Sequence, residues 1–167
     1  DKFLTNKTLL AENYFYQQKN EMARDIYKFL KTIGPIYSWH SAKSITSILF
    51  NTNNKEDAIK KLKKEFKKIS NKNYEHYYEF ANINKDYENY EESVMYYSIA
   101  LKKIDKSNFL IPKILYRRGT SYERLGNWEN AEIDLKESLK ILPEQPHVLN
   151  YLAYSWIDKK INLDEGL

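Results

Sequence analysis

One pattern recurs along the chain, and this recurrence restricts the possible folds more than any other feature. The stretch YERLGNWENAEIDLKESLKILPE, residues 122–144, places Ala131 in the middle of an amphipathic run. Counterparts of this residue recur at successive spacings of 35, 35, 38 and 35, and they are Ala23, Ala58, Ser93 and Gly166. An internal period of 20–50 residues is typical of arrays of small stacked units. We therefore predict a repeat array rather than a bundle around one central core.

The scarce Pro and Ala residues fall at fixed positions within this repeat. The chain has only four Gly and four Pro, too few for the tight turns of an all-β fold. Pro is tolerated in the first turn of a helix or just past its end, and it breaks a helix inside. All four Pro lie at unit boundaries, at 35, 112, 143 and 146. Seven of the eight Ala fall on positions where two helices would cross closely, namely 11, 23, 58, 81, 100, 131 and 153.

Each unit is predicted to be a helical hairpin. In the fourth unit we expect a first helix over 112–124, a turn at Gly126-Asn127 and a second helix over 129–142. Apolar residues recur every three to four positions in the second helix, which gives one buried stripe. The 38-residue spacing predicts a longer loop or an extended helix end around 107–111. The predicted fold is all-α, a right-handed solenoid of stacked antiparallel hairpins.

The unit resembles the tetratricopeptide repeat (TPR), whose pattern runs W-x2-L-G-x2-Y…A-x3-F…P. The fourth unit carries this pattern at Leu115, Gly119, Tyr122, Ala131, Leu135 and Pro143. Arg118 departs from the usual Leu of the family. The resemblance implies a single array over 1–167, with repeats at about 4–37, 39–72, 74–107 and 112–145 and a truncated fifth at 146–167. A second helix of the fifth repeat would begin at Asp164.

The chain offers no convincing set of catalytic groups. It has no Cys, its three His (40, 76 and 147) lack metal-ligand spacing, and it contains no Gly-rich phosphate loop. No apolar run approaches the length of a membrane span. We therefore expect a non-catalytic protein without cofactor or metal, and without a transmembrane segment in this chain.

The TPR resemblance implies that the first helices line a concave groove that binds a peptide or protein partner. Tyr, amide, hydroxyl and charged side chains on this face could hydrogen-bond a peptide backbone while burying its apolar side chains. The candidates are Lys43, Phe50, Tyr78, Asn82, Lys113, Tyr116, Arg117, Thr120, Arg124, His147, Asn150 and Tyr154. The same face also carries Ser47, Glu75, Lys85 and Glu123. A two-carboxylate clamp of the kind in chaperone-binding TPRs would match at Lys43, Lys113 and Arg117, but Ser47 and Glu79 replace its two Asn.

The C-terminal third resembles a group of proteobacterial TPR proteins through the phrase LNYLAYSWID, residues 149–158, in which Ala153 replaces the usual Gly. Members of this group are usually exported. Related lipoproteins act as adaptors that activate a periplasmic protease and deliver cell-wall hydrolases to it. The resemblance implies an envelope adaptor in the bacterial periplasm or at a membrane, with such a protease or its substrate as partner. A cytoplasmic location stays open.

A Lys-rich helix predicted over 55–72 supports an alternative function. The chain carries a net charge of +4 with an isoelectric point of about 8.9. Nucleic acid or an anionic surface could bind these lysines. The stretch lacks the Arg and interleaved aromatic residues expected for base stacking, which makes nucleic acid the less favoured partner.

Overall fold

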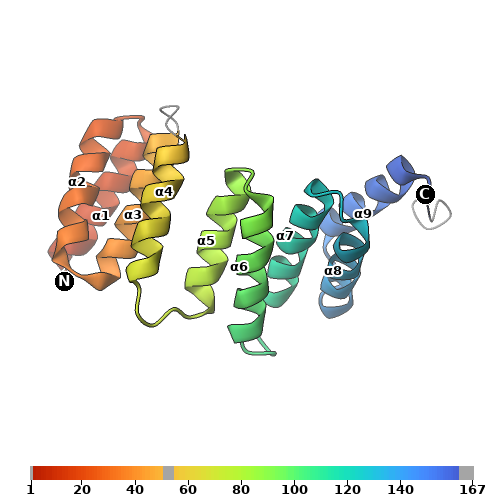
Figure 1. The fold of residues 1–167 in the computed structure, drawn as a ribbon. Coiled ribbons are helices and arrows are strands. Elements are labelled where there is room, and N and C mark those ends of the chain that lie inside the picture. Colours follow the sequence, from red (N-terminus) through yellow and green to blue (C-terminus); the bar gives the residue numbers. More distant parts are fainter. Residues whose placement is uncertain (1, 51–54, 162–167) are drawn as a thin grey trace. The chain divides into compact units, whose positions relative to one another are not determined.

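The computed structural model describes residues 2–50 and 55–161, apart from the side chains at 35 and 36. Nine helices and no strand occur in this part of the chain (Figure 1). The predicted all-α architecture is confirmed. The helices are α1 (Lys2–Tyr16), α2 (Asn20–Ile33), α3 (Pro35–Phe50), α4 (Lys55–Lys68), α5 (Tyr74–Asp86), α6 (Tyr90–Lys103), α7 (Ile111–Arg124), α8 (Trp128–Ile141) and α9 (Pro146–Lys159).

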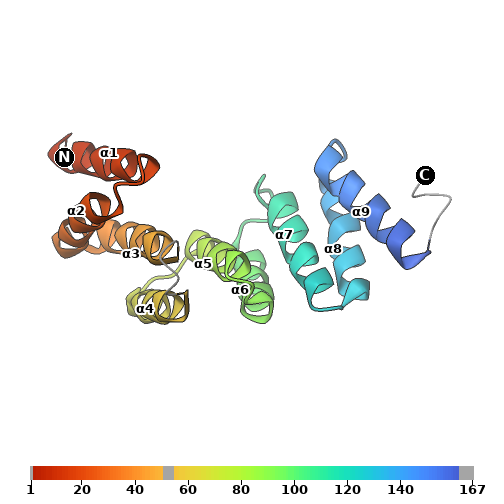
Figure 2. The same ribbon diagram turned by 90° about the horizontal axis from the view of Figure 1, so that it is seen from above.

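The chain divides into two compact units, Asp1–Asn71 with α1–α4 and Lys72–Leu167 with α5–α9. Each unit has an apolar core of its own. In the first unit Tyr27, Leu30 and Ile48 pack around two buried alanines. In the second unit successive helices pack on one another, α5 on α6, α6 on α7, α7 on α8 and α8 on α9 (Figure 2). Six of the seven alanines at the predicted crossing positions are buried, and the seventh, Ala153 on α9, is half-buried.

The α7–α8 hairpin follows the predicted boundaries within one residue at each end. Gly126 has a φ of 75°, in the left-handed region that favours glycine, and it ends the turn after α7. The side-chain oxygen of Asn127 accepts a hydrogen bond from the Asn130 backbone N–H at 3.3 Å and caps α8. Gly119 lies at the helix crossing, where an added Cβ would lie 3.1 Å from the Ala131 carbonyl oxygen. A Cβ at this position would require its neighbours to shift by a few tenths of an ångström, so glycine allows the close approach of α7 and α8.

The longer spacing between the third and fourth repeats is a loop at residues 104–110, between α6 and α7. Ile104 is buried, and the Asp105 carboxylate accepts hydrogen bonds from Ser107. The Asn108 side chain accepts a hydrogen bond from the Leu110 N–H at 2.9 Å. The loop is therefore held by its own polar contacts. Gly166 and the second helix expected from Asp164 lie outside the described residues.

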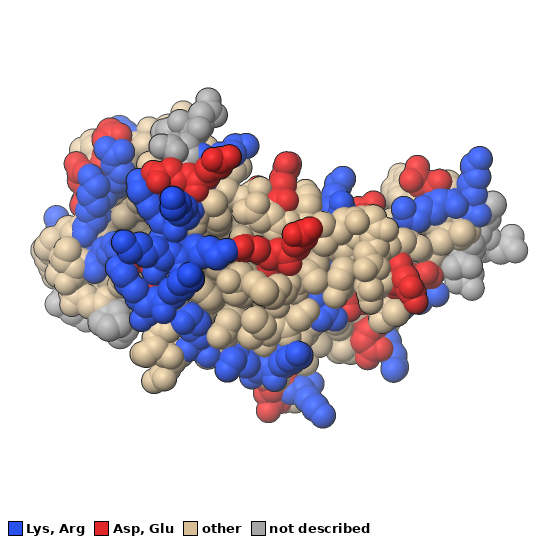
Figure 3. Space-filling view, in the orientation of Figure 1, with Lys and Arg blue, Asp and Glu red and all other residues tan. Residues whose placement is uncertain are grey.

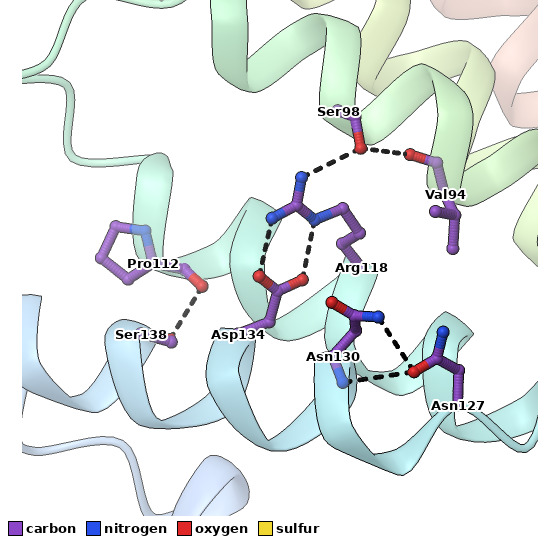
Figure 4. Close-up of polar contacts among 8 residues, drawn as sticks. All are labelled: Val94, Ser98, Pro112, Arg118, Asn127, Asn130, Asp134 and Ser138. Carbon is purple, nitrogen blue, oxygen red and sulfur yellow. Dashed lines mark hydrogen bonds and ion pairs between the residues drawn. The ribbon is translucent and has the colours of Figure 1, made fainter.

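Arg118, the departure from the family pattern, has a defined structural role. Its guanidinium donates two hydrogen bonds of 2.7 Å to the carboxylate of Asp134 on α8 (Figure 4). It also donates to the Ser98 hydroxyl on α6 at 2.9 Å, and that hydroxyl donates in turn to the Val94 carbonyl oxygen. One side chain thus joins three helices of the second unit, and we call this set the Arg118 clasp.

Candidate functional site

The first helices of three successive repeats in the second unit, α5, α7 and α9, are joined by side-chain contacts. The Lys85 ammonium on α5 donates a hydrogen bond to the Thr120 hydroxyl on α7. The Tyr116 ring on α7 lies edge-on to the His147 ring on α9, with ring centres 4.8 Å apart. The hydroxyl of Tyr151 on α9 donates to the Glu123 carboxylate at 2.9 Å. These contacts make a continuous row of polar and aromatic side chains, which we call the first-helix face.

At the α5 end of this face, tyrosines and an amide form a small network. The Tyr97 hydroxyl donates to the side-chain oxygen of Asn82 at 2.7 Å, and the Tyr78 ring lies 6.2 Å from the Tyr97 ring. Burial raises the pKa of Tyr97, so this phenol keeps its proton. Burial acts to lower the pKa of Arg117, but the neighbouring Tyr97 hydroxyl and the Asp86 charge raise it overall. The guanidinium is therefore a fixed positive charge beside two tyrosine rings.

Lys85 is the most perturbed cation of the face. Burial, together with the positive charges of Arg117 and Arg124, lowers its pKa to about 8, against the opposing effect of Asp86. Its partner Thr120 is a neutral hydroxyl and cannot cancel the charge. The ammonium also lies 6.0 Å from the centre of the Tyr116 ring. Three cations therefore share one region of the face, and their mutual repulsion favours an incoming negative charge.

The C-terminal end of the face combines an aromatic pair with an acid. The Tyr116 and Tyr151 rings meet edge-on, 6.1 Å between centres. Burial and the hydrogen bond to Glu123 raise the pKa of Tyr151. Glu123 also lies 3.8 Å from the guanidinium of Arg124, which is largely exposed. The acid is thus occupied by two internal partners.

Seven of the twelve predicted site residues contribute to the first-helix face. Tyr78, Asn82, Tyr116, Arg117, Thr120 and His147 contribute to the networks above, and Arg124 contributes its charge. Three further predicted residues lie on α7 and α9 with exposed side chains, namely Lys113, Asn150 and Tyr154. The first unit contains Lys43, with its ammonium 5.8 Å from the Trp39 ring, and Phe50, whose ring lies 4.6 Å from the Lys55 ammonium.

Sequence reasoning missed two residues of the face. Tyr97 lies on α6 at a packing position of a second helix, and its hydroxyl reaches the face only because the ring crosses the hairpin. Tyr151 occupies the same position in its repeat as Arg117, and this correspondence could have indicated it. Lys85 was one of the expected positions on this face, but its central place depends on burial that sequence does not show.

Within residues 2–50 and 55–161, no three His, Asp or Glu side chains group in a way that could hold a metal ion. None of the helices described is long and apolar enough to cross a membrane. The face offers hydrogen-bond donors, aromatic surfaces and positive charge, which are the means of recognising another molecule.

Comparison with known proteins agrees with the repeat pattern. Residues 112–145 match the family model of the tetratricopeptide repeat. A crystal structure of MamA is 17% identical, with a TM-score of 0.69 over 93% of this chain and 87% of that one. MamA from Desulfovibrio magneticus RS-1 is 12% identical, with a TM-score of 0.72 over 97% and 88%. A tetratricopeptide repeat protein from Parabacteroides merdae is 16% identical, with a TM-score of 0.73 over 99% of this chain and 63% of that one.

The similarity to these structures concerns the fold, an all-α solenoid, because the identities are low. No curated protein sequence matches the chain significantly.

Proposed function

We propose that this chain, whose residues 112–145 match the tetratricopeptide repeat, is a non-catalytic scaffold that binds an extended segment of a partner protein on its first-helix face. The observation that supports this most is the group of three cations, Lys85, Arg117 and Arg124, set among tyrosine rings. We propose in particular that the bound segment is acidic.

The cations favour an acidic partner because they repel one another in the free protein. Each of the two arginines acts to lower the pKa of Lys85, which shows that the three charges are close enough to interact. A carboxylate placed among them would replace repulsion by attraction. It would also restore the solvation that burial removes from Lys85, since charge-assisted hydrogen bonds are stronger than neutral ones.

The tyrosines supply the apolar part of the proposed interaction. The rings of Tyr78 and Tyr116 offer large contact area with few rotatable bonds, so they lose little conformational entropy on binding. Asn82 lies on the same helix as Tyr78, and its side-chain N–H groups can donate hydrogen bonds to a peptide backbone. A segment that alternates apolar and acidic residues would match both features.

The proposed finer role is that of an adaptor in the bacterial cell envelope, with a periplasmic protease or its substrate as partner. It rests on the resemblance of residues 149–158 to exported repeat proteins. The first-helix face would then hold one partner while other surfaces of the array remain accessible.

A peptide-selection experiment tests the acidic partner. The full chain, immobilised at low salt, is used to select from a random peptide library, and we expect acidic sequences with apolar residues to be enriched. Arg124→Glu reverses a charge on the face without loss of folding, because this side chain is largely exposed. Lys140→Glu makes the same change on the second helix α8, at an exposed side chain.

We expect Arg124→Glu to weaken binding of a selected peptide about fivefold, as for one exposed ion pair, and Lys140→Glu to leave it unchanged. Lys85→Met should weaken binding more, because this cation is less screened by solvent. Enrichment of basic or purely apolar peptides, or equal effects of Arg124→Glu and Lys140→Glu, would contradict the proposal.

A further inference from the structure

The first unit contains a cavity that has no part in the proposed peptide binding. It has a volume of about 280 Å³ and lies among α2, α3 and α4. Its lining includes four aliphatic side chains, those of Ala42, Ile45, Leu49 and Leu62. This volume is near the lower end of the range for small-ligand sites, so the cavity suits a small apolar group.

The cavity exists beside a residue that departs from the repeat pattern. Thr46 occupies the helix-crossing position that Gly119 holds in the fourth repeat and that alanine holds in the others. At Gly119 even one Cβ would lie 3.1 Å from backbone, so a branched side chain at this crossing needs more room. Thr46 is buried, and its hydroxyl donates to the Ala42 carbonyl oxygen at 2.8 Å. Correspondingly, α4 packs less extensively on α3 than α8 packs on α7.

A second departure introduces a charge into the same cavity. Glu65 stands where the other complete repeats have Leu30, Ala100 and Ser138, all buried. Its carboxylate pairs with the Lys31 ammonium at 2.9 Å and with the Lys68 ammonium at 3.0 Å. Burial acts to raise the pKa of Glu65, but these two lysines lower it overall. The acid is therefore ionised, and it fixes two cations at the edge of the cavity.

The cavity's edge remains strongly positive. Lys61 and Lys64 line it as well, so the lining contains four lysines and one carboxylate, that of Glu65. Lys61 is held by Asp57, four residues earlier on α4, at 2.5 Å. Figure 3 shows Lys and Arg side chains gathered over α4 on the face in view. Three lysines of the Lys-rich helix, Lys61, Lys64 and Lys68, thus line a cavity that also has aliphatic walls.

We propose that this cavity binds a single-chain amphiphile with an anionic headgroup, either carboxylate or phosphate. The apolar chain would contact the aliphatic interior, and the headgroup would lie among the lysines of the edge. Charge complementarity favours an anion, and the aliphatic lining favours an alkyl chain over a nucleobase, which would require an aromatic surface for stacking. This ligand class fits the described lining better than nucleic acid does.

Calorimetric titration of the full chain tests the proposal. Octyl phosphate and octanoate carry the two candidate headgroups on one chain, octyl glucoside carries the chain without charge, and inorganic phosphate carries charge without the chain. We expect binding of one or both anionic amphiphiles and no comparable binding of the other two. The stronger of octyl phosphate and octanoate identifies the headgroup.

Two pairs of charge reversals on α4 provide matched variants. Lys61→Glu with Lys64→Glu changes the edge of the cavity, whereas Lys60→Glu with Lys67→Glu makes the same change at exposed positions outside the lining. We expect at least tenfold weaker binding, about 1.4 kcal/mol, for the first pair and less than a threefold change for the second. Leu49→Phe, which adds volume to the lining, should also weaken binding.

Other outcomes would overturn the proposal. Equal weakening by both charge-reversal pairs would indicate diffuse attraction by a charged helix. Binding of octyl glucoside with the affinity of octyl phosphate would indicate an apolar site without headgroup recognition. Phosphatidylglycerol vesicles that bind the wild type and both pairs alike, with no binding of free amphiphile, would indicate a membrane surface as the ligand. Acidic-peptide binding by the first-helix face is measured separately, so the failure of either proposal is distinguishable.

Discussion

Breaking the Arg118 clasp should destabilise the second unit strongly, and this prediction can be worked out from the structure. The Asp134 side chain is only 5% exposed, and Arg118 supplies two hydrogen bonds to its carboxylate. Arg118→Met keeps the straight aliphatic stem but leaves a buried carboxylate without these donors. Removing one partner of a buried ion pair costs about 3–5 kcal/mol. We expect the free energy of unfolding to fall by that amount.

The double variant separates the net contribution of the ion pair to stability from the cost of leaving one charge buried without its partner. Asp134→Leu has nearly the same branching as Asp and removes the carboxylate, so Arg118→Met with Asp134→Leu buries no charge. Replacing both partners of a buried pair by apolar residues is often neutral or stabilising. The Ser98 hydroxyl still donates to the Val94 carbonyl oxygen and needs no new partner. We therefore expect the double variant to lie within about 1 kcal/mol of the wild type.

The assay must resolve the second unit from the first. Hydrogen exchange read by mass spectrometry follows α7 and α8 directly, and urea unfolding gives the free energies. With an m-value of about 2 kcal/mol/M, the single variant should lower the urea midpoint by roughly 2 M. Loss of less than 1 kcal/mol in Arg118→Met, or equal loss in the single and double variants, would refute the account of a buried pair.

Three further changes test other parts of the molecule. Gly119→Ala should cost about 1–3 kcal/mol by overpacking the helix crossing, whereas Gly34→Ala, with extended backbone and open space around it, should cost nothing measurable by thermal unfolding. The pKa of Lys85 is lowered in the folded state, so the unfolded chain binds more protons than the folded one between about pH 8 and 10.5. The free energy of unfolding should therefore rise with pH in this range. Urea unfolding of the wild type and of Lys85→Met at several pH values measures this rise as the difference between the two proteins. Asn73→Ala removes a side-chain cap of α5 and should cost about 1 kcal/mol, with faster exchange of the first α5 amides, while Asn89→Ala, where no side-chain cap bond exists, should have little effect.

The hairpins could be predicted from sequence because their determinants are local and repeated. Pro at unit boundaries, small residues at crossings and Gly126 in the turn each act within one repeat, and α7 and α8 begin and end within a residue of expectation. The longer spacing before the fourth repeat likewise predicted extra residues, which form the loop at 104–110. Leu115, Gly119, Ala131 and Leu135 of the TPR pattern are buried for the same reason, whereas Tyr122 is half-buried and Pro143 is exposed.

The contacts between repeats could not be predicted from a repeat pattern. In the sequence, Arg118 is only an Arg at a position where the family usually has Leu. Its role becomes clear from the side-chain conformation that places the guanidinium between Asp134 and Ser98. Lys85 and Thr120 are 35 residues apart, and their meeting depends on how successive hairpins stack. Thr46 occupies a small-residue position of the repeat, but whether its side chain fills the space at the crossing or lies beside a cavity depends on how closely α3 and α4 approach. These contacts between repeats depend on side-chain geometry, which the spacing of the sequence repeat does not predict.

The Arg118 clasp also determines how the second unit should respond to mechanical force. In a plain array each hairpin is held to the next mainly by apolar packing, so a chain pulled from its ends would extend one hairpin at a time, by roughly 115 Å per 34 residues. The clasp ties Ser98 of α6 to both helices of the following hairpin. Two repeats would then release together, in a single step of roughly 230 Å, and the stretched protein would resist up to a higher force before it yields.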